Sequence, residues 1–226
     1  MTDTPQTIHL HEYQPPAFLV ERVELEFDLQ PHDTTVLARA TFRRNPDHGA
    51  DNGADNADLR LDGEDMELVS LSLDGTVLAA ADYDLDAAGL SLTDLPDAFE
   101  LSVVTRIAPA ANTKLEGLYQ SSGIFCTQCE AQGFRRITYF PDRPDVMTTY
   151  RVTMRAEKAV CPILLCNGNL LDAGDLPDGR HFAVWDDPFP KPSYLFALVA
   201  GDLRWLEDHF TTQSGRNVQL RIYTDP

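Results

Sequence analysis

Apolar and polar residues alternate with a period of two along much of the chain. The first clear run alternates apolar with acidic residues, and its apolar members are Val23, Leu25, Phe27 and Leu29. This period is typical of a strand that buries one face. A turn at residues 31–33 separates it from a second alternating run at residues 36–42. We therefore predict that these two runs form an antiparallel pair.

Further short runs of the strand type follow, each bounded by Gly, Pro, Asn or Asp. They cover residues 57–61, 66–73, 76–80, 83–86, 89–95, 99–107, 148–158, 161–171, 180–187, 194–203 and 217–224. The pair Asp74–Gly75 is a strong signal for a two-residue hairpin. Strands that recur at intervals of about 8–12 residues, with no helical period beyond about two turns, indicate an all-β fold. We predict an antiparallel β-sandwich or open barrel, with residues 1–226 forming one β-domain.

Two segments do not follow the strand pattern. Residues 1–17 are polar and end in Pro15–Pro16, which predicts an irregular lead-in. Residues 45–58 read NPDHGADNGADNAD and lack an apolar anchor, so we expect a mobile acidic surface loop. A calcium-binding loop is disfavoured there, because the glycine and the closing glutamate are out of register and no helices flank the segment.

The most informative stretch is residues 112–143, NTKLEGLYQSSGIFCTQCEAQGFRRITYFPDR. Two glycines, Gly117 and Gly123, divide it into short pieces. Its aromatic residues are Tyr119, Phe125, Phe134, Tyr139 and Phe140, and between them lie Cys126, Gln128, Cys129, Glu130, Arg135 and Arg136. Long loops fixed by apolar anchors usually carry function. We therefore predict a functional loop in this stretch.

The charge balance limits the partners that this protein can have. The 226 residues include 36 acidic and 18 basic ones, for a net charge of −18. Such a field repels nucleic-acid phosphates and anionic membrane surfaces, and it attracts cationic ligands. No window has the roughly 18–20 apolar residues of a membrane helix. The N-terminus lacks the basic and apolar regions of a signal peptide, so we expect a cytoplasmic protein.

The four cysteines form two closely spaced pairs, Cys126 with Cys129 and Cys161 with Cys166. A zinc site needs two cysteine pairs that face each other in tight turns. The second pair instead spans the apolar, strand-like run PILL, so its two sulfurs would not converge. A redox C-x-x-C usually opens a helix, and no helical period follows Cys129. Disulfides are disfavoured in a cytosolic chain. Reduced, partly buried thiols are the simplest interpretation, and a metal-binding protein that uses the four cysteines is kept as an alternative.

Other candidate groups have structural interpretations. Arg135 and Arg136 could bind a ligand carboxylate, but salt bridges to loop acids explain them as well. The segment Asp186–Pro192 could dock a peptide, although we favour a rigid connector into the next apolar run. The histidines are dispersed and form no metal cluster by spacing; they are His9, His11, His32, His48, His181 and His209.

Three long strings carry a resemblance to a known family. They are residues 112–154, CPILLCNGNL at 161–170 and WDDPFPKPSYLFALVAGDL at 185–203. In content, order and spacing they resemble the bacterial form of the aminopeptidase N family of zinc metallopeptidases. The family implies a multidomain enzyme that releases N-terminal amino acids from peptides. Its saddle-like N-terminal β-domain packs against a thermolysin-like catalytic domain.

The motifs that bind zinc and cleave the substrate in this family do not occur in the chain. It contains neither HExxH nor GxMEN. The resemblance therefore implies the N-terminal domain alone, with the catalytic domain and its zinc after residue 226. We expect no metal ligands, no catalytic residues and no peptidase activity in this chain by itself. A free-standing β-sandwich binding or scaffold module is the alternative.

The resemblance also implies two substrate-binding residues, Gln128 and Glu130, in the string TQCE. A carboxylate at Glu130 can pair with the α-ammonium group of a peptide substrate, and the amide oxygen of Gln128 can accept a hydrogen bond from it. An internal peptide bond has no ammonium group and would leave Glu130 unpaired. We therefore expect these two residues to favour peptide N-termini.

Overall fold

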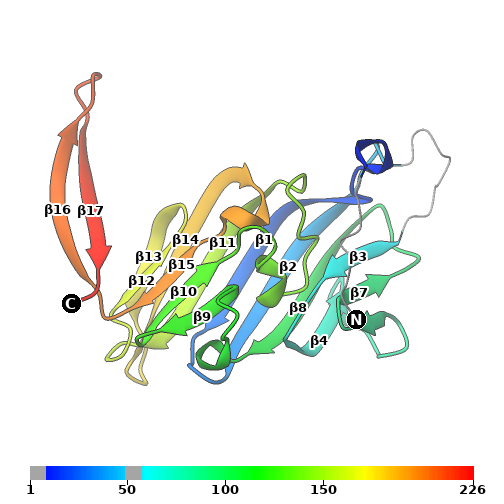
Figure 1. Ribbon diagram of the computed structural model, residues 1–226, viewed down its shortest axis with the longest axis horizontal. Helices are drawn as coiled ribbons and strands as arrows, with labels where there is room; N and C mark the ends of the chain where they lie inside the picture. Colours follow the sequence, from blue (N-terminus) through cyan, green and yellow to red (C-terminus); the bar gives the residue numbers. More distant parts are fainter. Residues whose placement is uncertain (1–8, 49–57) are drawn as a thin grey trace.

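The computed structural model describes residues 9–48 and 58–226. Its largest element is an eight-stranded sheet (Figure 1). The strands of this sheet are β1 (Phe18–Asp28), β2 (Thr34–Arg44), β4 (Glu67–Leu73), β5 (Thr76–Val77), β8 (Ala98–Ile107), β11 (Thr148–Glu157), β13 (Asn169–Asp175) and β14 (Arg180–Lys191). Their order is β13–β14–β11–β1–β2–β8–β4–β5. Among the described strands, β1 and β11 form the one parallel pair.

Two smaller sheets form a second layer against the large one. One contains β9 (Gly117–Ser121), β10 (Ile124–Gln128), β12 (Ile163–Cys166) and β15 (Leu198–Gly201), in the order β12–β15–β10–β9. The other contains β3 (Leu59–Asp62), β6 (Asp84–Asp86) and β7 (Gly89–Leu92), in the order β3–β7–β6. One continuous core of buried side chains includes residues from all three sheets. The predicted all-β sandwich is therefore confirmed.

The helical segments are short 3₁₀ turns of three residues each. They are η1 (Leu10–Glu12), η2 (Pro109–Ala111), η3 (Phe134–Arg136) and η4 (Ser193–Leu195). In the part of the chain that the structure describes, no helix is long and apolar enough to cross a membrane.

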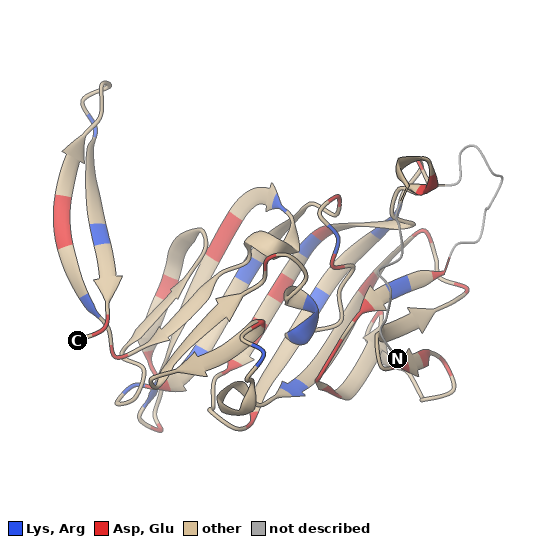
Figure 2. Cartoon of the chain, viewed as in Figure 1, with Lys and Arg blue, Asp and Glu red and all other residues tan. Residues whose placement is uncertain are grey.

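The alternating pattern of β1 decides which of its faces is buried. Val23, Leu25 and Phe27 are at most 1% exposed and face the core. On the opposite face Glu26 accepts hydrogen bonds from Arg39 at 2.7 Å and from Arg155 at 3.0 Å. Burial opposes the ionisation of Glu26, but these two arginines outweigh it and lower its pKa. Figure 2 shows that acidic and basic residues are interspersed on the strands of the large sheet. This charged face is suited to solvent.

Most predicted strands recur in the structure, although the strand predicted at residues 194–203 begins in a 3₁₀ turn, Ser193–Leu195, and only Leu198–Gly201 is strand. Four further corrections follow. The stretch 112–143 is not one loop, because it contains the hairpin β9–β10. Its turn is Ser122–Gly123, and both residues have the positive φ of a two-residue hairpin turn. The predicted strand 161–171 is in fact two strands, β12 and β13. They belong to different sheets and are separated by a turn at Asn167–Gly168.

The other two corrections concern the C-terminal third. The connector predicted at Asp186–Pro192 is wrong, since β14 continues to Lys191 and pairs there with Thr148 of β11. The prolines in this part of β14 lack the backbone N–H that a neighbouring strand would need. They are tolerated because β13 begins only at Asn169, which leaves one edge of this part of β14 without a strand partner among the described residues. Residues Arg204–Thr211 form an unpredicted strand, β16. Most of the predicted acidic loop, at residues 49–57, lies outside the described residues, as do residues 1–8 of the lead-in.

The strand β16 pairs with β17 (Asn217–Thr224) in a two-stranded hairpin that projects from the body of the molecule (Figure 1). Cross-strand partners share a face, and one face of this hairpin is largely apolar, although it also carries Asp208 and, at its base, the pair Arg204–Thr224. Its pairs are Leu206 with Ile222, Asp208 with Leu220, and Phe210 with Val218. Leu206 is 70% exposed and Ile222 is 68% exposed. An isolated hairpin is marginally stable in water, so this face is suited to a partner surface.

Candidate functional site

The structure brings Gln128 and Glu130 together at the end of β10. Gln128 is the last residue of this strand and pairs with Gly117 of β9. Both polar residues are exposed, whereas Cys129 between them is 3% exposed and belongs to the core. The alternation of a strand therefore directs the thiol inward and the two polar side chains outward. The Nε2 of Gln128 donates a hydrogen bond to the backbone oxygen of Glu130 at 3.2 Å.

Residues 129–133 form a tight turn that carries Glu130. The backbone N–H of Gly133 closes the turn by donating to the oxygen of Cys129 at 2.8 Å. A Cβ at Gly133 would lie 2.4 Å from the oxygen of Gln128 and 2.9 Å from the nitrogen of Gly117. These are backbone atoms, so glycine is required at position 133 for space. The peptide bond between Glu130 and Ala131 is cis.

The segment η3 follows this turn directly and anchors it in the core through Phe134. Phe134 is fully buried and packs edge-on against other aromatic rings. Its ring centroid lies 5.1 Å from that of Phe140, 5.3 Å from that of Phe196 and 6.2 Å from that of Tyr150. Edge-to-face contacts of this kind stabilise one arrangement of the rings. The turn that carries Glu130 is therefore fixed on one side by β10 and on the other by η3.

Arg135 belongs to a nearly buried ion pair with Asp142. The side chain of Arg135 is 14% exposed and that of Asp142 is 1% exposed. The Nε of Arg135 lies 3.1 Å from Asp142, and Ser193 of η4 donates to the same carboxylate at 2.5 Å. Asp62 also lies near Arg135, at 3.5 Å. Burial raises the pKa of Asp62, and Arg135 partly opposes this effect.

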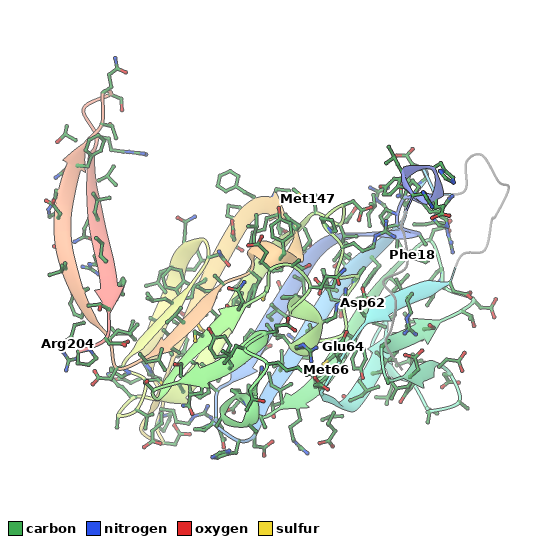
Figure 3. All side chains as sticks on the ribbon, viewed as in Figure 1. Phe18, Asp62, Glu64, Met66, Met147 and Arg204 are labelled. Carbon is green, nitrogen blue, oxygen red and sulfur yellow. The ribbon has the colours of Figure 1, made fainter. Side chains whose placement is uncertain are left out.

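Arg136, the next residue of η3, pairs with three acids, of which Glu64 also lies 3.8 Å from Arg135. Its guanidinium contacts Glu64 at 2.6 Å, Glu116 at 3.0 Å and also Asp65. Figure 3 shows Asp62 and Glu64 close to the middle of the molecule, at the end of β3. The interpretation of both arginines as salt-bridge partners is therefore confirmed.

The carboxylate of Glu130 has a different environment from these paired acids. Within residues 9–48 and 58–226, no hydrogen bond or ion pair engages it. The amide nitrogen of Gln128 is already bonded, which leaves its Oε1 as an acceptor. An unpaired carboxylate beside an amide oxygen can accept several hydrogen bonds from one cationic donor. The arrangement therefore offers free acceptors to a donor from outside the chain.

The four cysteines are free, so the interpretation as reduced thiols fits the structure. Burial raises the pKa of Cys161 to about 11 and that of Cys166 to about 12, which keeps both thiols protonated at neutral pH. The described residues contain no group of three or more His, Cys, Asp or Glu that could hold a metal ion. The donor sets in this part of the chain therefore do not fit zinc.

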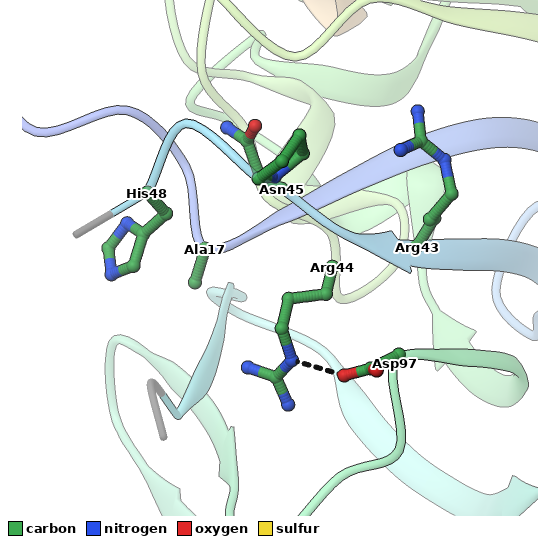
Figure 4. A pocket seen from close by; sticks show the side chains of 7 residues that line it. Ala17, Arg43, Arg44, Asn45, His48 and Asp97 are labelled. Atoms are coloured by element: carbon green, nitrogen blue, oxygen red, sulfur yellow. Dashed lines mark hydrogen bonds and ion pairs between the residues drawn. The ribbon is translucent and has the colours of Figure 1, made fainter. Parts of the chain in front are cut away.

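Two pockets elsewhere are separate from this site. One, of about 450 Å³, lies at the ends of β1 and β2, where Arg44 pairs with Asp97 at 2.8 Å (Figure 4). The other, of about 600 Å³, is lined by the turns after β1 and β11 and by Phe125 and Cys161. Gln128 and Glu130 line neither pocket. They stand on an open surface of the chain.

Sequence reasoning missed the residues that support the site. Asp142, Ser193 and Asp62 were not singled out, although they hold Arg135 in place. Ser193 is 51 residues from Asp142 in the sequence, and Asp62 is 80 residues from it. No local spacing connects them, so only the fold could reveal this group.

Known proteins resemble the chain in sequence and in fold. The profile of the family described as Peptidase M1 N-terminal domain matches residues 50–195. The chain is 52% identical over 225 residues to aminopeptidase N of Caulobacter vibrioides and 46% identical over 225 residues to aminopeptidase N of Escherichia coli. In both cases the match covers all of this chain and 25% of the relative. The chain thus spans about a quarter of the length of these curated relatives.

Solved structures extend this similarity. Legionella pneumophila aminopeptidase A, crystallised with aspartic acid, has 37% identity and a TM-score of 0.88, over 96% of this chain and 25% of that one. An M1 zinc metallopeptidase from Deinococcus radiodurans has 14% identity and a TM-score of 0.73, over 92% of this chain and 47% of that one. At this low identity, the second match shows the fold alone.

Proposed function

Because the chain belongs to the peptidase M1 N-terminal domain family, we propose that it is the N-terminal β-domain of an aminopeptidase, which releases N-terminal amino acids from peptides. In this proposal the domain supplies substrate recognition, and the catalytic domain follows residue 226. The observation that carries the proposal is the unpaired carboxylate of Glu130 beside Gln128, on a turn fixed at both ends. The high identity to two aminopeptidase N sequences supports it.

The proposed recognition depends on the charge of the substrate's first residue. A free α-ammonium group carries three N–H donors, which the Glu130 carboxylate and the Gln128 Oε1 can accept. The catalytic domain would cover this surface and exclude water, which strengthens the ion pair. A peptide bond in the middle of a chain offers no ammonium and would leave Glu130 buried and unpaired. This difference would restrict the enzyme to peptide N-termini.

Zinc belongs to the proposal only as a metal of the catalytic domain. The described residues do not fit it, and no step of its chemistry is assigned to this chain. A cytoplasmic location is also proposed, and the four free cysteines support it, because thiols persist in a reducing compartment.

The apolar face of the β16–β17 hairpin is the proposed contact with the catalytic domain. We expect Leu206→Ser combined with Ile222→Ser to leave the melting temperature of the chain 1–226 within about 1 °C, since both side chains are exposed there. In the full-length enzyme the same change is expected to cost about 1.5–3 kcal/mol for each side chain that the interface buries. Thermal unfolding of both proteins measures this.

Glu207→Ser serves as the control for this prediction. Glu207 lies on the opposite face of the hairpin, where it pairs with Arg221 at 2.9 Å. We expect this control to have little effect in either protein. Equal melting temperatures for the double variant and the full-length wild type would rule out the proposed contact.

The role of Glu130 is tested by Glu130→Ala in the full-length enzyme. The loss of a charged partner for the α-ammonium group is expected to lower kcat/KM for aminoacyl substrates by about 30-fold, or about 2 kcal/mol. Steady-state kinetics on an unblocked aminoacyl substrate measures the effect. Glu100→Ala is the matched control, since Glu100 is an exposed acid on β8. A Glu130→Ala enzyme with wild-type kcat/KM would refute the proposed function.

A further inference from the structure

Three segments that are distant in the sequence meet at the side chain of Arg136. Glu64 and Asp65 follow β3, Glu116 precedes β9, and all three acids contact the guanidinium. The Arg136 side chain is only 10% exposed, whereas its acid partners range from half-buried to exposed: Glu64 is 32%, Glu116 is 50% and Asp65 is 59% exposed. The planar guanidinium has donors on several edges and is held by all three carboxylates at once.

The same residue touches both ends of the turn that carries Glu130. At the far end, the N–H of Arg136 donates to the oxygen of Gly133 at 3.1 Å. At the near end, Gly117 is the strand partner of Gln128. A Cβ at Gly117 would lie 2.8 Å from the Cβ of Arg136 and 3.0 Å from the oxygen of Gly133. Arg136 therefore packs where the start and the end of the turn come together.

The pairs with Glu116 and Asp65 involve exposed acids, so these two stabilise the fold only weakly. Pairs between partly exposed side chains contribute little to the free energy of unfolding. Their geometric effect is larger, because three acceptors from two other segments fix the direction of the Arg136 side chain. Since the Arg136 backbone belongs to η3, this fixes η3 against β9 and against the segment after β3. Because η3 follows the 129–133 turn and β9 pairs with the strand before it, these contacts also fix the position of the turn.

We propose that Arg136 is a positioning residue for Glu130. The inference rests on the proposed function, in which Glu130 pairs with the substrate's α-ammonium group. Arg136 does not contact the substrate. It holds the turn so that the Glu130 carboxylate and the Gln128 Oε1 reach the same ammonium group.

The test is a double-mutant cycle in the full-length enzyme with Arg136→Gln, Glu130→Gln and the two combined. For an unblocked aminoacyl substrate, Arg136→Gln is expected to raise KM about fivefold with kcat changed less than about twofold. In the Glu130→Gln background, the same replacement is expected to have no further effect, because residues in one functional unit are not additive. Arg136→Lys keeps the charge but lacks the planar fork, and should give an intermediate KM.

Controls and outcomes separate this inference from the proposed function. Arg106→Gln removes an exposed arginine that pairs with Asp33 and Glu67 on the large sheet, and should leave KM unchanged. If the effects of Arg136→Gln and Glu130→Gln are additive, or if Arg136→Gln leaves KM unchanged, Arg136 does not position Glu130, and the proposed function stands. If Glu130→Gln alone leaves KM unchanged, both the proposed function and this inference are overturned.

Discussion

Replacing Arg135 with methionine is expected to lower the free energy of unfolding by about 3–5 kcal/mol. The replacement removes the cation next to Asp142, whose side chain is 1% exposed. Methionine preserves much of the side-chain volume, so the cost comes from a buried charge without its partner. Ser193 still donates to Asp142, but a neutral hydroxyl cannot balance a full negative charge. With typical stabilities of about 5–15 kcal/mol, this loss removes a large share of the stability of the fold.

Chemical denaturation monitored by circular dichroism measures this loss. Arg106→Met is the matched control, because the side chain of Arg106 is 45% exposed in its ion pairs and should cost less than about 1 kcal/mol. Adding Asp142→Asn to Arg135→Met removes the unpaired charge and should recover part of the loss. A full loss that persists in this double variant would show that packing, and not charge, explains the effect.

Replacing Phe134 with alanine is expected to cost about 3–5 kcal/mol, because it leaves a cavity among rings that cannot collapse freely. Phe134 is fully buried against Phe140, Tyr150 and Phe196. It is also the first residue of η3, so its loss should loosen the turn that carries Glu130. In the full-length enzyme, KM for an aminoacyl substrate is expected to rise at temperatures where the variant remains folded.

Thermal and denaturant unfolding measure the stability cost of Phe134→Ala. Phe189→Ala removes the same ring from a site where it is 74% exposed, so we expect less than about 0.5 kcal/mol there. Phe134→Leu fills part of the cavity and should lie between wild type and Phe134→Ala. A Phe134→Ala chain as stable as the Phe189→Ala chain would contradict the anchoring role of η3.

The strand pattern could be predicted where burial is one-sided. Val23, Leu25 and Phe27 alternate with acids, and the structure buries the first set and leaves the second partly exposed. The prediction failed at β9–β10, where Gly123 was read as a break in a loop although it occupies the turn of a hairpin. It also failed at β16, because all of its residues are exposed and its pattern reflects no core of this chain.

The candidate site could be predicted only in part, and for a different reason. Gln128 and Glu130 were identified through resemblance to a family, and their shared position at the end of β10 follows from the alternation of a strand. The residues that support them could not be predicted from the sequence. Arg135 pairs with Asp142, and Ser193, which donates a hydrogen bond to Asp142, lies 51 residues further on. Interactions over such distances leave no local pattern in the sequence.

The parallel contact between β1 and β11 has a consequence for synthesis of the chain on the ribosome. Residues 18–28 of β1 emerge early and can pair at once with β2, but β11 begins only at residue 148. At typical elongation rates of about 5–20 residues per second, roughly 6–24 s pass before that second neighbour is made. During this time one edge of β1 stays bare and can pair with another nascent chain. Crowded polysomes should therefore favour misassembly of this protein, and a chaperone that covers the edge should suppress it.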